Sequence, residues 1–225
     1  MMVVSFQSVA EEAVSRARYD CGNVRDLAAL FTPDKLAVLR EQVGVCCFLA
    51  FHARGDREIA GYVRSGTIAD DSGPDILVLF ALDEPAPIAV PLGGGSFERW
   101  GEAQRSVHPA YRLVRMLFDG AAPPLPGLVV FGDIAADTDA VYLPLGHLAD
   151  EQEVRTHLRQ VFADIAHAHA AARSGRFLDD LGVAWTRRGL AYERTDRRPM
   201  REWLIEGFRV VRENYGDIVT TLGLL

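Results

Sequence analysis

Cysteine and lysine are both scarce in this sequence of 225 residues. There are three cysteines, and two of them, Cys46 and Cys47, are adjacent. An odd number with this spacing argues against a secreted disulfide framework. Lys35 is the only lysine among 24 basic residues. The arginine excess is most simply explained by a bacterial-type, GC-rich coding composition, so it indicates no function by itself.

Basic leader segments and long apolar runs are missing as well. Residues 1–7 have neither the basic region nor the apolar stretch of a signal peptide. The longest apolar run, at 43–51, has the length of a strand, whereas a membrane helix needs ~20 residues. We therefore predict a cytoplasmic protein that does not associate with a membrane.

The charge balance is acidic, with 31 Asp and Glu against 24 Lys and Arg, for a formal net charge of −7. Such an acidic chain is a poor general binder of nucleic acid, because phosphate contacts need a basic surface or a strong basic patch. Hydrophobic residues make up 49% and charged residues 24%, which is typical of a folded globular domain. The length suits a single domain spanning 1–225.

Strands are predicted where apolar residues run without interruption, as in strands with both faces covered. Such runs lie at 45–51, 76–80 and 128–131. Glu58–Val63, after a turn at 53–56, is interpreted as a further strand. Residues 141–143 are predicted to pair with 128–131 as a hairpin.

Helices are predicted from capping residues and apolar spacing. Thr32 and Pro33 begin one helix, Ser96 and Pro109 begin two more, and residues 9–17 also have helical spacing. Asp150 with Glu153 forms a capping box for a long helix. Its apolar stripe consists of Val154, Leu158, Val161, Ile165 and Ala168. After Pro199, another helix directs Met200, Trp203, Leu204, Val211 and Tyr215 toward the core.

This order of elements predicts an α/β or α+β domain with a mixed sheet of about five strands and helices packed on it. Residues 1–44 would form N-terminal helices and 45–172 the sheet core. The remaining residues, 173–225, would form a C-terminal helical appendage. We find no internal repeat.

Residues 74–172 resemble part of the thioredoxin-like fold. A buried strand leads to helices, Pro126 stands just before another buried strand, a hairpin follows, and a long amphipathic helix closes the unit. The two-cysteine motif that opens the first helix of that family is absent, and the corresponding stretch, Leu82–Pro85, contains no cysteine. The resemblance therefore implies a redox-silent relative that serves in binding rather than in disulfide exchange.

The cysteines and histidines are weak candidates for a catalytic or metal site. Alternation along a strand predicts that Cys46 and Cys47 are buried on opposite faces, and Cys21 has no activating cation beside it. A metal site is geometrically conceivable on the long helix, but a solvated polar face explains the same residues better, so no metal is predicted. That face carries His157, Asp164 and His167. His52, at a strand end, has no partner that the sequence identifies.

Two loops have residues that suit ion binding. Gly94, Gly95 and Ser96 precede a predicted helix and could present backbone amides to an anion, although a flexible connector is the better interpretation. The aspartates at 133, 137 and 139 lack the spacing of a calcium loop, so we interpret them as a polar hairpin loop. Asp70–Gly73 is interpreted as a turn.

The arginines of the C-terminal region are the candidate partner-binding residues. They are Arg187, Arg188, Arg194, Arg197, Arg198 and Arg201. Arginine suits carboxylate or phosphate recognition, and Trp185 and Tyr192 could add stacking surface. An acidic partner, acidic residues of the same fold, or RNA would each satisfy these charges, and internal pairing or solvation is the simpler interpretation.

Two classes of function follow from these observations. The first is a non-catalytic protein-interaction or regulatory domain, with a protein partner or self-association and no cofactor. The alternative is an enzyme acting on a small anionic substrate. It would combine the loop Gly93–Ser96 with His52 or His108 as an acid–base group and an arginine for the substrate charge. A small-molecule ligand thus remains open as a second class of partner.

Overall fold

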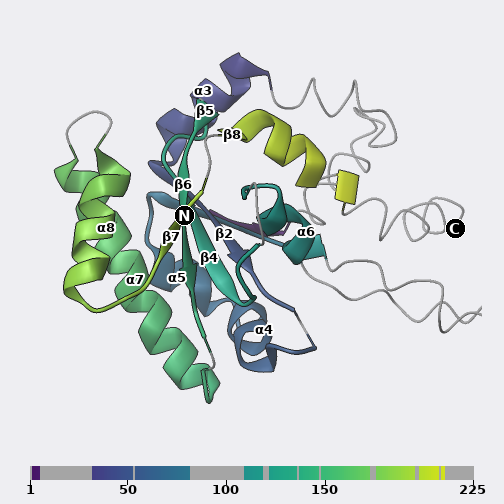
Figure 1. The fold of residues 1–225 in the computed structure, drawn as a ribbon, viewed down its shortest axis with the longest axis vertical. Coiled ribbons are helices and arrows are strands. Elements are labelled where there is room, and N and C mark those ends of the chain that lie inside the picture. The colour runs from purple at the N-terminus through teal and green to yellow at the C-terminus, as the bar shows by residue number, and fades with distance from the viewer. Residues whose placement is uncertain are drawn as a thin grey trace, which may run out of the picture.

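A mixed β-sheet runs through the centre of the protein (Figure 1). The structure is a computed structural model. It describes residues 2–5, 32–52, 54–81, 109–118, 122–135, 137–146, 148–172, 176–195, 198–207 and 209–210. The predicted helices at 9–17 and after Ser96 lie outside these ranges.

The main sheet has six strands in the order β1-β3-β2-β4-β6-β7. Their bounds are Met2–Ser5 (β1), Val45–Ala50 (β2), Ile76–Phe80 (β3), Gly127–Phe131 (β4), Ala140–Pro144 (β6) and Glu193–Arg194 (β7). The strands β1, β3 and β2 are parallel, whereas the pairs β2–β4, β4–β6 and β6–β7 are antiparallel. A separate two-stranded sheet pairs β5 (Asp137–Thr138) with β8 (Arg198–Pro199). The predicted mixed sheet and the predicted hairpin are confirmed.

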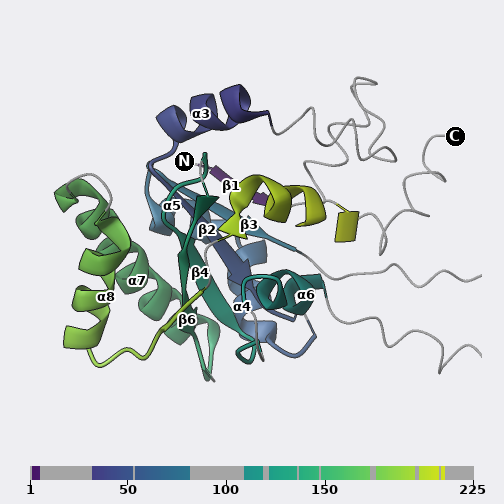
Figure 2. The same cartoon turned by 45° about the horizontal axis from the view of Figure 1, so that its top comes forward.

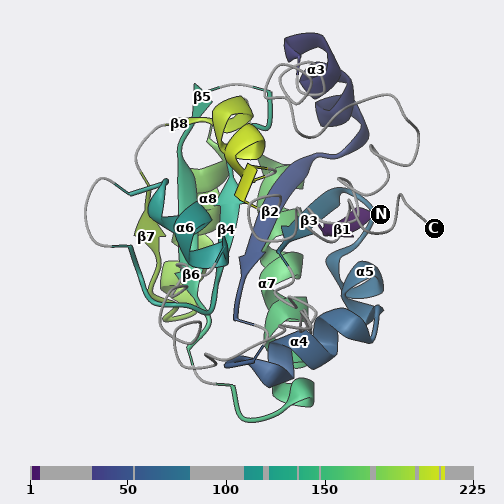
Figure 3. The ribbon, with the colours of Figure 1, turned by 90° about the vertical axis from the view of Figure 1, so that its right-hand side faces the viewer.

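Helices cover both faces of this sheet, which is why its central strands are apolar throughout (Figure 2). One face packs against α4 (Arg57–Arg64), α5 (Thr67–Ser72), α7 (Glu151–Ala171) and α8 (Phe177–Arg187). The other packs against α3 (Pro33–Gln42), α6 (Pro109–Arg115) and the helix at 200–207. Figure 3 looks onto this second side, with α6 in front of the sheet and α7 behind it.

The long helix α7 forms as its capping residues and apolar stripe predict. The Asp150 side chain accepts a hydrogen bond from the Glu153 amide at 2.8 Å, and the Glu153 carboxylate accepts one from the Ala149 amide at 2.7 Å. The stripe from Val154 to Ala168 is buried against the sheet. The capping box thus fixes where α7 begins, and the stripe fixes which side it buries.

The interpretation of Glu58–Val63 as a strand is wrong, because these residues belong to helix α4. Ile59, Tyr62 and Val63 are buried at helical spacing, three and four residues apart. In such a short segment the apolar positions fit both periods, so spacing alone does not separate a helix from a strand. Asp70–Ser72, interpreted as a turn, form the end of α5, which stops at Gly73 with φ +81°.

The described residues of the C-terminal segment, in 176–195 and 198–207, contribute to the core. Trp185 of α8 is fully buried on one face of the sheet, and Trp203 is buried on the other. The Trp203 indole Nε1 donates to the carbonyl of Leu113 at 3.0 Å, and its ring contacts Phe48 and Phe131 with centroids 5.1 and 4.9 Å apart. A buried tryptophan typically contributes about 3–5 kcal/mol, so the described part of this segment stabilises both layers.

One close contact at the start of β4 requires a glycine. A Cβ on Gly127 would lie 2.0 Å from the ring of Tyr142 on the neighbouring strand. The missing side chain lets the Tyr142 hydroxyl donate to the carbonyl of Pro124 at 2.7 Å. The Leu125–Pro126 peptide bond just before this strand is cis.

Candidate interaction surface

The candidate site is built by α8 and by the turn that follows it. Leu178, Leu181 and Trp185 recur every three or four residues and bury one side of α8. After the helix the chain reverses: the Gly189 amide donates to the Thr186 carbonyl at 3.0 Å and the Leu190 amide to the Trp185 carbonyl at 2.9 Å. Gly189 has φ +74°, which completes a Schellman motif and directs the chain back along α8 into β7.

A shallow hollow of about 420 Å³ lies between α8 and β7. Its lining residues are Asp179, Val183, Thr186, Arg187, Tyr192 and Arg194. Gly182 makes room for one wall, because a Cβ there would lie 2.3 Å from the Tyr192 hydroxyl oxygen. The Tyr192 ring also meets Trp185 edge to face, with centroids 5.9 Å apart. The hollow is therefore a built feature of the α8–β7 reversal, which stands at one margin of the sheet in Figure 1.

Arg188 and Arg194 of the predicted arginine set form internal pairs. Arg188 binds the Asp164 carboxylate and, at 2.8 Å, the Gln160 side-chain oxygen, so it ties the end of α8 to α7. Arg194 binds Asp179 of α8 and lies 3.6 Å from a carboxylate oxygen of Asp139. Of the alternatives for the arginines, acidic residues of the same fold are therefore the partners of Arg188 and Arg194.

The other predicted arginines do not form one patch. Arg187 is exposed in the last turn of α8 and lines the hollow, without an ion pair to any residue that the structure describes. Arg201 belongs to the helix on the opposite face of the sheet, and Arg198 to the small β5–β8 sheet. Arg197 lies outside the described residues. Of the expected stacking residues, Trp185 is buried and Tyr192 lines the hollow.

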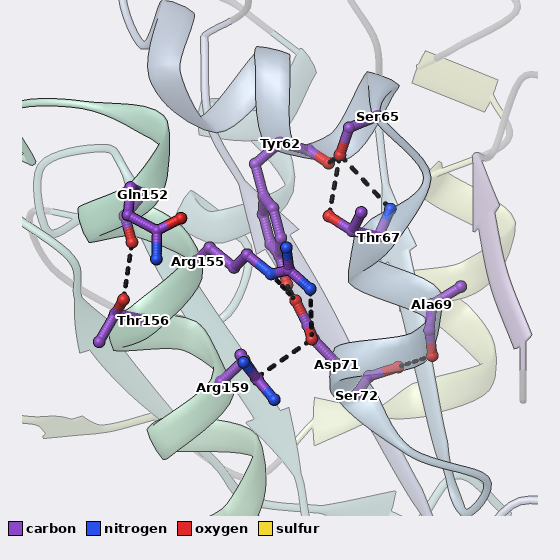
Figure 4. A network of polar contacts seen from close by, with 10 residues as sticks. All are labelled: Tyr62, Ser65, Thr67, Ala69, Asp71, Ser72, Gln152, Arg155, Thr156 and Arg159. Atoms are coloured by element: carbon purple, nitrogen blue, oxygen red, sulfur yellow. Dashed lines mark hydrogen bonds and ion pairs between the residues drawn. The ribbon is translucent and has the colours of Figure 1, made fainter.

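A second charged cluster, which the sequence did not indicate, joins α4, α5 and α7 (Figure 4). The Asp71 carboxylate is only 5% exposed and accepts from Arg155 Nε and from the Tyr62 hydroxyl, each at 3.0 Å. It also forms an ion pair with Arg159, whose Nε lies 3.2 Å away. Burial, followed by the negative charge of Asp71, raises the pKa of Tyr62. The hydrogen bond to Asp71 raises the pKa of Arg155. The Arg155 guanidinium therefore stays charged and the Tyr62 phenol stays neutral, so the cluster joins helices rather than transferring protons.

The cysteines of β2 lie where alternation predicts. Cys46 faces the layer of α6 and Trp203, and Cys47 faces the layer of α7. Both thiols are free and buried, and burial raises the pKa of each. Neither provides the accessible thiolate that disulfide exchange requires. Cys21 lies outside the described residues.

His52 belongs to a closed turn that joins β2 to α4. Its Nδ1 accepts from the amides of Arg54 and Gly55, both at 3.1 Å. The Asp56 carboxylate accepts from the His52 amide at 2.7 Å. The enzyme hypothesis combines His52 or His108 with the loop Gly93–Ser96. That loop, with the predicted anion-binding residues Gly94, Gly95 and Ser96, lies outside the described residues, and so does His108.

The polar face of α7 carries a half-buried histidine. Burial, followed by the positive charge of Arg188, lowers the pKa of His157. Within the described ranges there is no group of three or more His, Cys, Asp or Glu side chains that could hold a metal ion. In the polar loop, Asp133 instead accepts from Arg40 at 3.3 Å and from the Ala135 amide at 2.8 Å.

Comparisons with known proteins give no relative for this chain. No family model, no curated protein and no solved structure matches it. Among the helices that the structure describes, none has both the length and the apolar character needed to cross a membrane.

Proposed function

We propose that this chain is a non-catalytic protein-interaction domain built on a thioredoxin-like core. The proposal is supported by the order of elements β2, α4, α5, β3, α6, β4, β6 and α7. It is also supported by the sheet order β3-β2-β4-β6, with β2 and β3 parallel and the other pairs antiparallel. On this proposal the unit begins at β2, so it starts earlier than the stretch 74–172.

If the thioredoxin-like unit begins at β2, a different part of this chain corresponds to the two-cysteine motif of that family. If β2 is the first strand, the first helix is α4, and the motif position is at Asp56 and the residues after it. Leu82–Pro85, which lie outside the described residues, would not correspond to it. Asp56 is the N-cap residue of α4, and its carboxylate is occupied by the His52 amide.

The observation that carries the proposal is this closed turn at the start of α4. A thiol-exchange protein needs a low-pKa thiolate at that position, and this chain has a hydrogen-bonded aspartate there. The buried thiols of β2 lie inside the sheet instead. A core of this kind serves recognition, and its contacts come from surfaces such as the α8–β7 hollow.

The experiment has a thiol arm and a binding arm. The tagged full chain is recovered from its native cells, treated with iodoacetamide while folded, and analysed by mass spectrometry at each cysteine. We expect Cys46 and Cys47 to stay unmodified in the folded chain. In a control unfolded in urea, both should react. We also expect no reduction of insulin disulfides, and recovery of a protein partner in stoichiometric amount. Insulin reduction would overturn the redox-silent part, and recovery of the chain alone would overturn the interaction part.

A further inference from the structure

We propose that the α8–β7 hollow binds an extended segment of a partner protein that carries an acidic residue and an aliphatic residue. The segment lies along β7 and extends the sheet by one strand. This inference rests on the proposed interaction function and states which surface carries it.

The charge of the hollow calls for a carboxylate. Arg194 is already matched by Asp179 and Asp139, whereas Arg187 has no carboxylate partner among the residues that the structure describes. Arg187 is exposed and lines the hollow. Hydrogen bonds between a guanidinium and a carboxylate are about twice as strong as neutral ones, so an acidic side chain suits this position best.

The apolar part of the hollow lies directly beside this arginine. Val183 precedes Arg187 by four residues, so both are on the same side of α8. Val183 is 49% exposed, and apart from Val38 it is the only large hydrophobic side chain exposed in the described part of the chain. Tyr192 lines the same hollow as Val183, so an aliphatic side chain bound here would cover both residues.

The backbone of β7 provides the third element of recognition. In the described sheet β7 is the outermost strand and pairs only with β6. The Thr195 amide donates to the Ala140 carbonyl at 2.9 Å, toward β6. Because hydrogen-bonding groups alternate along an antiparallel strand, the amide of Arg194 points away from β6. Because this amide points outward, the edge of β7 can pair with an added strand, and every second side chain of that strand would face the hollow.

The test is a titration of the full chain with a labelled, acetylated eight-residue peptide that repeats Thr-Glu-Thr-Val. Its controls are peptides in which the glutamate is replaced by lysine or the valine by serine. We expect the Thr-Glu-Thr-Val peptide to bind the wild-type chain. In Arg187→Glu its dissociation constant should rise about tenfold, because one charge-assisted hydrogen bond is lost. Val183→Asp weakens binding similarly. Hydrogen exchange at the Arg194 amide slows when the peptide is bound.

Two matched variants control for charge and exposure. Arg115→Glu makes the same change in the last turn of α6, on the opposite side of the sheet, and Val38→Asp replaces a valine that is 54% exposed on α3. Both should bind the peptide like the wild type. The inference is overturned by equal affinity for the lysine peptide, by an equal loss in the two controls, or by no binding at all. It is also overturned if sedimentation shows a dimer of the chain that Val183→Asp dissociates. Each of these results leaves partner recovery, the test of the proposed function, as a separate outcome.

Discussion

The Asp71 cluster and the α8–β7 hollow use arginine in opposite ways. In the Asp71 cluster a buried carboxylate is surrounded by two guanidinium groups and a phenol, so the acidic group is fully matched. In the hollow, Arg187 is exposed beside a valine and has no carboxylate from the described residues. A matched buried charge holds helices together, whereas an unmatched exposed one is available to a partner.

The largest effect is expected from breaking the matched cluster at its centre. Asp71→Asn should lower the free energy of unfolding by about 2–3 kcal/mol, because charge-assisted hydrogen bonds to a nearly buried group are lost. The loss stays moderate because Arg155 and Arg159, 38% and 60% exposed, can turn to water. Urea denaturation measures it. Asp70→Asn, next to it but exposed, is the control, and an equal loss in both variants would contradict a special role for Asp71.

A smaller effect is expected from removing only the phenol of the same cluster. Tyr62→Phe deletes one hydrogen bond to Asp71 and should reduce stability by about 1 kcal/mol. Combined with Asp71→Asn, it should cost less than the sum of the two single changes, because both remove the same contact. Strict additivity in the double-mutant cycle would show that the two groups are not coupled.

The third prediction concerns Arg188, which is paired with Asp164, and its effect on the pKa of His157. Because burial and Arg188 lower the pKa of His157, the folded state takes up this proton less readily than the unfolded state. The stability should therefore fall as the pH drops below about 6.5, the ordinary histidine value, toward the lower pKa of the folded state. Arg188→Gln should raise the pKa of His157, measured by NMR titration. His157→Gln should remove this part of the pH dependence, and an unchanged profile would refute the assignment.

The smallest effect on stability is expected from the unmatched arginine. Arg187→Glu should change the free energy of unfolding by no more than about 0.5 kcal/mol, as is usual for an exposed position without partners. Thermal denaturation of this variant beside Arg115→Glu measures it. A loss as large as that of Asp71→Asn would show that Arg187 supports the fold, and would remove the contrast between the two regions.

Local patterns were enough to predict the elements whose signals lie within a few residues. The α7 stripe repeats at the helical period, and its capping box marks where the helix begins. The strands β2, β3 and β4 are uninterrupted apolar runs, and the burial of the cysteines follows from alternation along a strand. Residues 58–63 are too few to separate the helical period from the strand period, which is why the strand prediction for α4 is wrong.

The sites depend on contacts between distant segments, which local patterns do not contain. Asp71 meets Arg155 across 84 residues of chain, and nothing near Asp70–Gly73 distinguishes its carboxylate from that of an ordinary turn. The arginines at 187–201 look continuous in sequence, but the chain crosses from one face of the sheet to the other between β7 and the helix at 200–207. A charge count along the sequence therefore overstated the patch.

The reversal after α8 has a consequence for how this surface can change over time. Because the chain turns back at Gly189, every residue lining the hollow comes from one contiguous stretch between Asp179 and Arg194. Substitution of the exposed lining residues can change this surface, whereas Leu181 and Trp185 of the same stretch belong to the buried core. The same short stretch therefore carries a surface that tolerates substitution on one side and part of the folding core on the other, so single side chains, and not the stretch as a whole, can change independently of the fold.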